Sequence, residues 1–387
     1  MIDSLVEQRS LMESLQYIWQ LRGWPRLSFD EEHLAEEVAL ARRVQVLVEG
    51  KLAALGFQER QDLAAEAWAQ EAMATAAIEG EKLDLLAVRS SIAQRLGGSA
   101  FKGPAAPRHV DGLLSIMDDA VVKASEPLTH ERLQAWQAAL FPTGLSGMRP
   151  VKTGAYRTEA MQIVSGPMGK ETVHYEAPAA KEVPAQMQKF LDWFNASHED
   201  SLAKAALSHV WFETIHPMDD GNGRVGRNIV DLCLALDAGE TSRLVRISQR
   251  LLDQREAYYH ELGRAQHGGL DVTPWMVWFV RQVRVAWEAA SAVVDASLEK
   301  ARFWAAHSGV PLNARQRKAV QAMLDQGPGG FQGGMSTRKY VSLTSTSRPT
   351  ASRELIELNV LGVLKQSGAG RSTRYYVNLP GWFPKQE

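Results

Sequence analysis

The sequence lacks most of what a secreted or membrane protein needs. Its 387 residues include a single cysteine, Cys233, which excludes an intramolecular disulfide and a zinc site built from cysteines. No apolar run approaches the roughly 20 residues of a membrane-spanning helix, and residues 1–15 lack the basic-then-apolar order of a signal peptide. We therefore expect a cytoplasmic protein with no structural metal and no membrane partner.

The chain as a whole has almost no net charge, but its parts do. The formal net charge is −2 at pH 7, from 43 basic and 45 acidic residues. Residues 301–387 hold 12 of the basic residues and 4 of the acidic ones, so the rest of the chain is acidic. A basic module joined to an acidic body predicts two different partners, one of them a polyanion.

Apolar periodicity predicts a mainly α-helical protein. Three- and four-residue steps recur over the first 95 residues and over five later stretches, at about 109–139, 183–196, 202–215, 222–236 and 251–306, the last divided near residue 270. Two short β-prone runs on either side of residues 165–169 predict the one clear hairpin before the C-terminal region.

Composition changes divide the chain into three predicted domains. Residues 1–98 form a helical N-terminal region, and residues 99–308 form a helical core that carries the hairpin. Residues 309–387 read as three helices followed by a basic hairpin, the order of a winged helix, with residues 345–358 as its recognition helix. Such a domain could bind DNA or another protein, and net charge does not decide between them.

The segment with the richest chemistry reads His-Pro-Met-Asp-Asp-Gly-Asn-Gly-Arg-Val-Gly-Arg over residues 216–227, between two predicted helices. Gly221 and Gly223 flank Asn222, so several backbone N–H groups can turn towards one point just before a helix begins. The helix dipole favours an anion there, and Arg224 and Arg227 project from one side of its first turns. The loop therefore predicts a site for a di- or triphosphate.

Two further residues of this segment suit phosphate chemistry. Asp220 supplies a hard oxygen ligand for Mg²⁺ held jointly with phosphates. His216 ends the preceding helix, where it could accept a proton from an attacking hydroxyl near neutral pH. An ordinary solvated turn with charges on its rim is the alternative reading of any one of these residues, but it explains the whole group poorly.

These residues resemble the Fic family, whose motif is HPFx(D/E)GNGRxxR. The match is complete except for Met218, which stands in place of Phe; Met is an apolar filler of similar size, so we expect it in the core. Residues 207–215 resemble the helix that precedes the motif in that family. Within it we interpret Phe212 and Ile215 as core contacts and His209 as a structural histidine.

The resemblance implies adenylyl transfer, in which AMP from ATP is placed on a Ser, Thr or Tyr hydroxyl of a target protein. The roles that it implies fall on five catalytic residues. His216 would be the general base, Asp220 the Mg²⁺ ligand, and Asn222, with the backbone of Gly221 and Gly223, the contact for the α- and β-phosphates. Arg224 would hold the β-phosphate and Arg227 the γ-phosphate.

Two further segments fit the same family. The hairpin around residues 162–174 resembles the family's flap, which holds the target segment by strand-like pairing beside the nucleotide, with Ile163 and Val164 as ATP contacts. Tyr259, Leu262 and Gln266 share one face of a predicted helix and resemble the lining of the adenine pocket. An ordinary surface hairpin and a plain amphipathic helix are the alternatives.

An inhibitory motif of the family, (S/T)xxxE(G/N), is matched by Thr75-Ala76-Ala77-Ile78-Glu79-Gly80. Thr75 and Glu79 are one helical turn apart, so both side chains reach the same surface, and Gly80 is well placed to end the helix. The resemblance implies that Glu79 pairs with Arg227 and so keeps the γ-phosphate out of its productive position.

Several alternatives stay open at this stage. The same fold could transfer UMP or a phosphoryl group, or remove AMP with Glu79 orienting a water molecule. A third alternative is a DNA-binding regulator in which the Fic domain only senses a nucleotide. The sequence also leaves open whether the chain modifies itself or forms a homodimer.

Overall fold

The computed structural model describes residues 16–96, 105–165, 172–327, 331, 333–380 and 382. By its internal contacts the chain divides into two units, Met1–Ala292 and Val293–Glu387. The predicted boundary at residue 98 lies outside the described residues, and the three predicted domains stay predictions. No helix in the described ranges is both long and apolar enough to cross a membrane.

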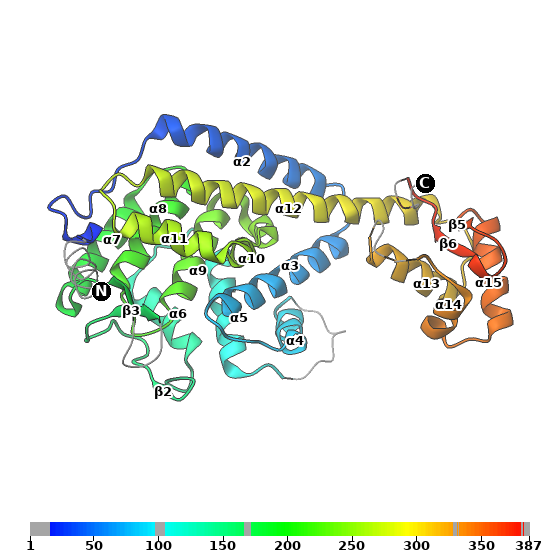
Figure 1. Cartoon of the computed structure of the whole chain (residues 1–387), viewed down its shortest axis with the longest axis horizontal. Helices are drawn as coiled ribbons and strands as arrows, with labels where there is room; N and C mark the ends of the chain where they lie inside the picture. The colour runs from blue at the N-terminus through cyan, green and yellow to red at the C-terminus, as the bar shows by residue number, and fades with distance from the viewer. Residues whose placement is uncertain are drawn as a thin grey trace, which may run out of the picture. The chain divides into compact units, whose positions relative to one another are not determined.

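The fold is mainly α-helical with small antiparallel hairpins, as predicted (Figure 1). The elements before the functional loop are η1 (Ile18–Gln20), α2 (Glu31–Leu52), α3 (Phe57–Ile78), α4 (Leu85–Arg95), α5 (Arg108–Val122), α6 (His130–Leu140), β1 (Leu145–Ser146), β2 (Arg149–Pro150), β3 (Gln162–Ser165), β4 (Thr172–Glu176), η2 (Ala180–Glu182), α7 (Val183–Ala196) and α8 (Ser201–Ile215). Those after it in the first unit are α9 (Asn222–Ala238), η3 (Gly239–Leu244), α10 (Ile247–Asp253) and α11 (Arg255–Gln266), with α12 (Thr273–Ala306) continuing into the second unit.

Helices α8 and α9 form the centre of the first unit. Every residue of α8 is buried, because neighbouring helices cover it on all sides. Helix α9 packs against α8, α5, α6 and α3, and α7 covers another side of α8. The loop between α8 and α9 is therefore anchored at both ends by the best-packed helices of the unit.

The N-terminal helices pack onto this centre. Asp30 caps α2 by accepting a hydrogen bond from the His33 N–H. Helix α2 lies alongside α12, where Glu37 accepts hydrogen bonds from Arg281 and Arg284 (Figure 1). Helix α3 contacts α9 and α10, so its C-terminal end reaches the functional loop.

The structure refines one sequence prediction about elements and contradicts two. The stretch at 109–139 is two helices, α5 and α6, because Thr129 caps a new helix by accepting from the Arg132 N–H. The stretch at 251–266 divides into α10 and α11 at Gln254, whose backbone (φ −116°, ψ 31°) is not helical. A second short hairpin, β1–β2, stands before the predicted one, and its two-residue strands are too short to give a period-two pattern.

The second unit has a core of its own. It contains α13 (Ala314–Asp325), α14 (Thr337–Thr344), α15 (Arg348–Val360) and the antiparallel pair β5 (Leu364–Ser367) and β6 (Arg374–Val377), with η4 (Gly370–Ser372) between the strands. Buried Glu354 joins three parts of it by accepting from the Tyr340 hydroxyl, Asn313 Nδ2 and Arg315. The order of helices and hairpin is the predicted one, and the winged helix stays a prediction.

Candidate active site

The functional loop has an unusual backbone at both ends. His216 follows α8 in a left-handed conformation (φ 49°, ψ 60°), and Gly221 precedes α9 with φ 87°. A Cβ atom at Gly221 would lie 2.9 Å from the ring of Phe141, so both conformation and space require glycine there. The predicted turn before a helix N-terminus is therefore present.

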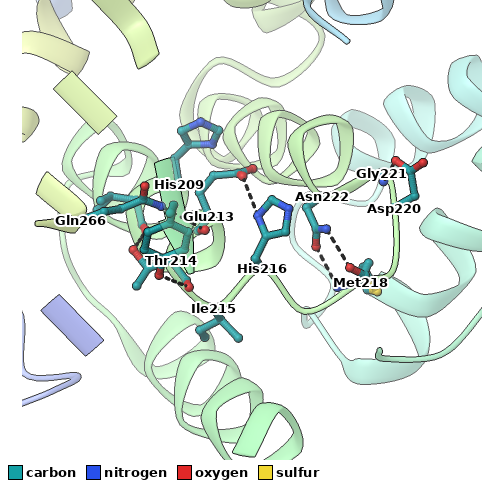
Figure 2. A network of polar contacts seen from close by, with 12 residues as sticks. His209, Glu213, Thr214, Ile215, His216, Met218, Asp220, Gly221, Asn222 and Gln266 are labelled. Carbon is teal, nitrogen blue, oxygen red and sulfur yellow. Dashed lines mark hydrogen bonds and ion pairs between the residues drawn. The ribbon is translucent and has the colours of Figure 1, made fainter. Parts of the chain in front are cut away.

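Asn222 fixes the shape of this loop. Its Oδ1 accepts from the Met218 N–H at 2.8 Å, and its Nδ2 donates to the Met218 carbonyl at 2.9 Å (Figure 2). Met218 itself is fully buried, which agrees with the expectation of a core contact. The side-chain amide of Asn222 is thus occupied by the loop, and the phosphate contact expected of this residue stays a prediction.

The imidazole of His216 lies between the core and a cavity. Its Nδ1 is 3.5 Å from Oε2 of Glu213, one turn earlier in α8 (Figure 2). Burial alone would raise the pKa of Glu213, but its contact with His216 and the nearby His209 and Arg227 lower it below the ordinary value. The carboxylate therefore stays charged although its side chain is 6% exposed.

A buried arginine supports the strained turn at His216. Arg157 Nε donates to the His216 carbonyl at 2.9 Å, and its Nη2 donates to the carbonyls of Pro178 and Ile215. The Tyr175 hydroxyl, from the flap strand β4, donates to the Thr214 carbonyl at 2.6 Å. The end of α8 is therefore held by the residues that precede and form the predicted flap. No role was predicted for Arg157, since one arginine in a polar loop carries no signal.

Both motif arginines are engaged by the end of α3. Arg227 Nη2 donates to Oε1 of Glu79 at 2.6 Å and to the Thr75 carbonyl at 3.1 Å, and its Nε donates to the Thr75 hydroxyl at 2.8 Å. Burial by itself would lower the pKa of Arg227, but the Glu79 carboxylate raises it. Gly80 (φ 78°) follows the last helical turn, as expected. Thr75 and Glu79 of the predicted inhibitory motif thus both bind Arg227.

A second glutamate in this turn was missed by the sequence analysis. Oε2 of Glu81 lies 3.0 Å from Nη1 of Arg224, whose guanidinium also packs over the Phe141 ring at 4.9 Å. Glu81 Oε1 lies 3.5 Å from Nε2 of His109. No sequence signal distinguishes Glu81 from an exposed acid, because its partner is 143 residues away.

One cavity of about 810 Å³ opens beside His216. This volume lies within the range of small-molecule sites. Ile163 and Val164 of β3, at a β-bulge, line one part of it, and the predicted adenine-pocket residues of α11 line another: Tyr259, Leu262 and Gln266. Gln266 also donates from Nε2 to the Glu213 carbonyl at 3.2 Å. The structure thus brings these predicted contacts together with His216, Gly223 and Arg227.

A second cavity, of about 770 Å³, lies on the other side of Glu79, which lines both. Asp220 and Arg224 line this second cavity together with Glu81, Arg108 and His109. Asp220 Oδ1 accepts from the Gly221 N–H at 2.6 Å, and Oδ2 lies 3.4 Å from Nη2 of Arg149. Gly223 is close to the boundary, since a Cβ atom there would lie 2.3 Å from Glu79 Oε1.

Comparison with known families matches two parts of the chain. Residues 127–234 match the Fic/DOC family, and this range contains the functional loop and the flap. Residues 17–97 match a domain of unknown function, DUF4172, and this range contains Thr75, Glu79 and Gly80.

Related proteins carry the same family name. The chain is 26% identical over 224 residues to the "Protein adenylyltransferase Fic" of Nematostella vectensis, covering 56% of this chain and 47% of that protein. It is 26% identical over 293 residues to the protein of the same name from Drosophila willistoni, covering 70% and 53%. The chain thus spans about half the length of these relatives. A crystal structure of a Fic family protein from Desulfovibrio desulfuricans G20 superposes over 91% of this chain and 98% of that one, with a TM-score of 0.57 at 20% identity.

Proposed function

Because residues 127–234 match the Fic/DOC family, we propose that this chain is a protein adenylyltransferase that moves AMP from ATP to a Ser, Thr or Tyr hydroxyl. One observation carries the proposal: His216, the N-terminal turn of α9 and the α11 residues Tyr259 and Leu262 all line a single cavity. An acid–base group, an anion site and an apolar wall are what transfer from a nucleotide to a hydroxyl needs.

The proposed reaction is an in-line displacement at the α-phosphorus of ATP. The target hydroxyl gives its proton to His216 Nε2 while its oxygen forms a bond to the α-phosphorus. The bond from that phosphorus to the bridging oxygen breaks, and pyrophosphate leaves with the electron pair. Backbone N–H groups at the start of α9 and the guanidinium of Arg224 offset the negative charge that collects on the phosphates.

Asp220 would hold the expected Mg²⁺. Its carboxylate is 30% exposed and faces the second cavity, which suits a cation shared between one carboxylate and substrate phosphates. When bound, magnesium would neutralise charge on the phosphates and the leaving pyrophosphate. Within the described residues, no group of three or more His, Cys, Asp and Glu side chains is placed to hold a metal by itself.

The proposal includes autoinhibition by Glu79. Its Oε1 lies 2.6 Å from Nη2 of Arg227, and Arg227 is the arginine expected to bind the γ-phosphate. A triphosphate would have to displace this ion pair or bind with its α-phosphate misaligned. Glu79 is 34% exposed, so it can move away without opening the core.

Incubation with Mg²⁺ and ATP labelled at the α-phosphate tests the function. We expect weak labelling of protein by the wild type, stronger labelling by Glu79→Gly and none by Glu79→Gly/His216→Ala. Mass spectrometry of the labelled protein separates AMP from UMP or phosphate, and release of AMP from a pre-labelled protein would indicate the reverse activity. Label on the chain itself would show self-modification. Equal labelling with and without His216 would refute the proposal.

DNA binding by the second unit is a second proposal. It is favoured by the exposed side chains of Arg348 and Arg353 on α15, in the part of the chain with 12 basic and 4 acidic residues.

A further inference from the structure

Glu213 is a buried acid with no assigned role. It lies in α8 between two histidines: His209, one turn earlier in the helix, and His216, which directly follows the helix (Figure 2). Its Oε1 is buried and has no hydrogen-bond partner among the described residues, and the same holds for His216 Nδ1. Glu213 Oε2 and His216 Nδ1 approach each other to 3.5 Å, so each group is a near polar partner of the other.

We propose that Glu213 is the positioning residue of His216. Its carboxylate directs Nδ1–H of the imidazole towards Oε2, so that the lone pair of Nε2 faces the cavity. It also compensates the positive charge that His216 acquires when it takes the proton of the target hydroxyl. This inference rests on the proposed function, in which His216 is the general base.

Glu213 can act on His216 in this way because its buried carboxylate is short of hydrogen-bond donors. Leaving a buried charged group short of hydrogen bonds is costly. The cost falls when the neighbouring imidazole becomes a cation, because the ion pair is then complete in a site of low dielectric constant. Glu213 therefore offsets the charge on His216 in the same step in which the proposed reaction needs a base.

The surroundings hold Glu213 in this place. Gly226 of α9 allows the close approach, since a Cβ atom there would lie 2.4 Å from Glu213 Oε1. The other ionisable groups that act on Glu213 are His209, Arg227, Tyr258 and Tyr175, on α8, α9, α11 and β4. His209 does not compete with His216 for the proton, because burial lowers its pKa to about 4. His216 is therefore the histidine left to pair with Glu213.

Nitrogen NMR on the full chain labelled with ¹⁵N-histidine tests this without any need for activity. The His216 signals are assigned by their loss in His216→Ala. In the wild type we expect a single tautomer with the proton on Nδ1. In Glu213→Gln we expect a mixture of the two tautomers, because the carboxylate that accepts from Nδ1–H is gone. Asp219→Asn, which removes a charge three residues from His216 on its other side, is the control and should keep the single tautomer.

Kinetics then connect the position of His216 to turnover. In the Glu79→Gly background, Glu213→Gln should lower kcat about 10- to 100-fold, with the KM for ATP changed less than about twofold. Glu213→Asp keeps the charge but shortens the side chain, so its kcat should lie between those of Glu79→Gly and Glu79→Gly/Glu213→Gln. It also serves as the test if Glu213→Gln does not fold. An unchanged tautomer and an unchanged kcat in a folded Glu213→Gln would overturn the inference. Absence of labelling by Glu79→Gly itself would instead refute the proposed function.

Discussion

The guanidinium of Arg224 lies 3.0 Å from the carboxylate of Glu81, two residues beyond the glutamate that binds Arg227. One turn of chain at the end of α3 thus places an acid on each of the two motif arginines. Both arginines are expected to bind phosphates of the same nucleotide, so we expect Glu81 to oppose nucleotide binding in the same sense as we propose for Glu79.

Removal of Glu81 should therefore add to the effect of removing Glu79. The Arg224–Glu81 pair involves a carboxylate that is 34% exposed, and such pairs contribute about 1 kcal/mol or less. We expect Glu79→Gly/Glu81→Gln to label protein about two- to fivefold faster than Glu79→Gly at low ATP, mainly through a lower KM. Glu36→Gln, on the exposed side of α2, is the charge-matched control. A KM equal to that of Glu79→Gly would show that Glu81 does not compete with ATP.

The loop and its two helices could be predicted from the sequence because the patterns that indicate them are local. Glycines on both sides of Asn222 require a turn, and the apolar periodicity on either side requires helices; α8, α9 and the β3–β4 pair lie where these signals put them. Burial of Phe212, Ile215 and Met218, and of His209 as a structural histidine, was also predicted and is confirmed.

The supporting residues were not predictable in the same way, because their partners are distant in sequence. Arg157 acts on carbonyls up to 59 residues away, and Glu81 on an arginine 143 residues away. Glu213 did carry a signal that could have been used: it is an acid that directly follows the apolar run Val210-Trp211-Phe212 in the last turn of a helix. Such an acid is costly unless it has a charged partner, and the nearest one in sequence is His216.

Replacement of Arg157 should uncouple the turn at His216 from the flap. In Arg157→Met the carbonyls of Glu159, Pro178, Ile215 and His216 lose their donor in a buried place. We expect a loss of about 3–5 kcal/mol in the free energy of unfolding, or about 10 °C in Tm, and loss of labelling in the Glu79→Gly background. Thermal unfolding measures the first effect. Arg149→Met is the control for stability, since Arg149 is 60% exposed, and a Tm for Arg157→Met as high as that of Arg149→Met would contradict the assignment.

The burial of His209 predicts a specific pH dependence of stability. Burial lowers its pKa to about 4 in the folded state from 6.5 in the unfolded state, so the unfolded chain binds the additional proton between these values. The stabilisation is therefore complete above pH 6.5 and decreases as the pH falls towards 4, by about 2 kcal/mol between pH 7 and pH 5.

Urea unfolding of His209→Gln and of the wild type at both pH values measures this effect. Glutamine can keep a hydrogen bond to the Tyr258 hydroxyl, which His209 Nε2 contacts at 2.9 Å, but it does not titrate. The difference in unfolding free energy between the two proteins should therefore shrink by about 2 kcal/mol from pH 7 to pH 5. The exposed His198 offers a control, because His198→Gln should keep the pH dependence of the wild type. A constant difference between His209→Gln and the wild type would mean that His209 is not held neutral.

The basic second unit should bind duplex DNA through α15 if the predicted winged helix is correct. Arg348 and Arg353 lie on the exposed side of this helix, and removal of one phosphate-binding arginine reduces the salt dependence of binding by about one unit in log K against log[salt]. Arg348→Ala/Arg353→Ala should therefore bind more weakly and with a slope lower by about two, whereas His216→Ala should bind as the wild type does. Arg302→Ala/Lys318→Ala removes the same charge from exposed positions outside α15 and should keep most of the affinity. Fluorescence anisotropy with a labelled duplex at low and at near-physiological salt separates these outcomes. Equally weakened binding by the two double variants would show that overall charge, and not the exposed side of α15, attracts the DNA.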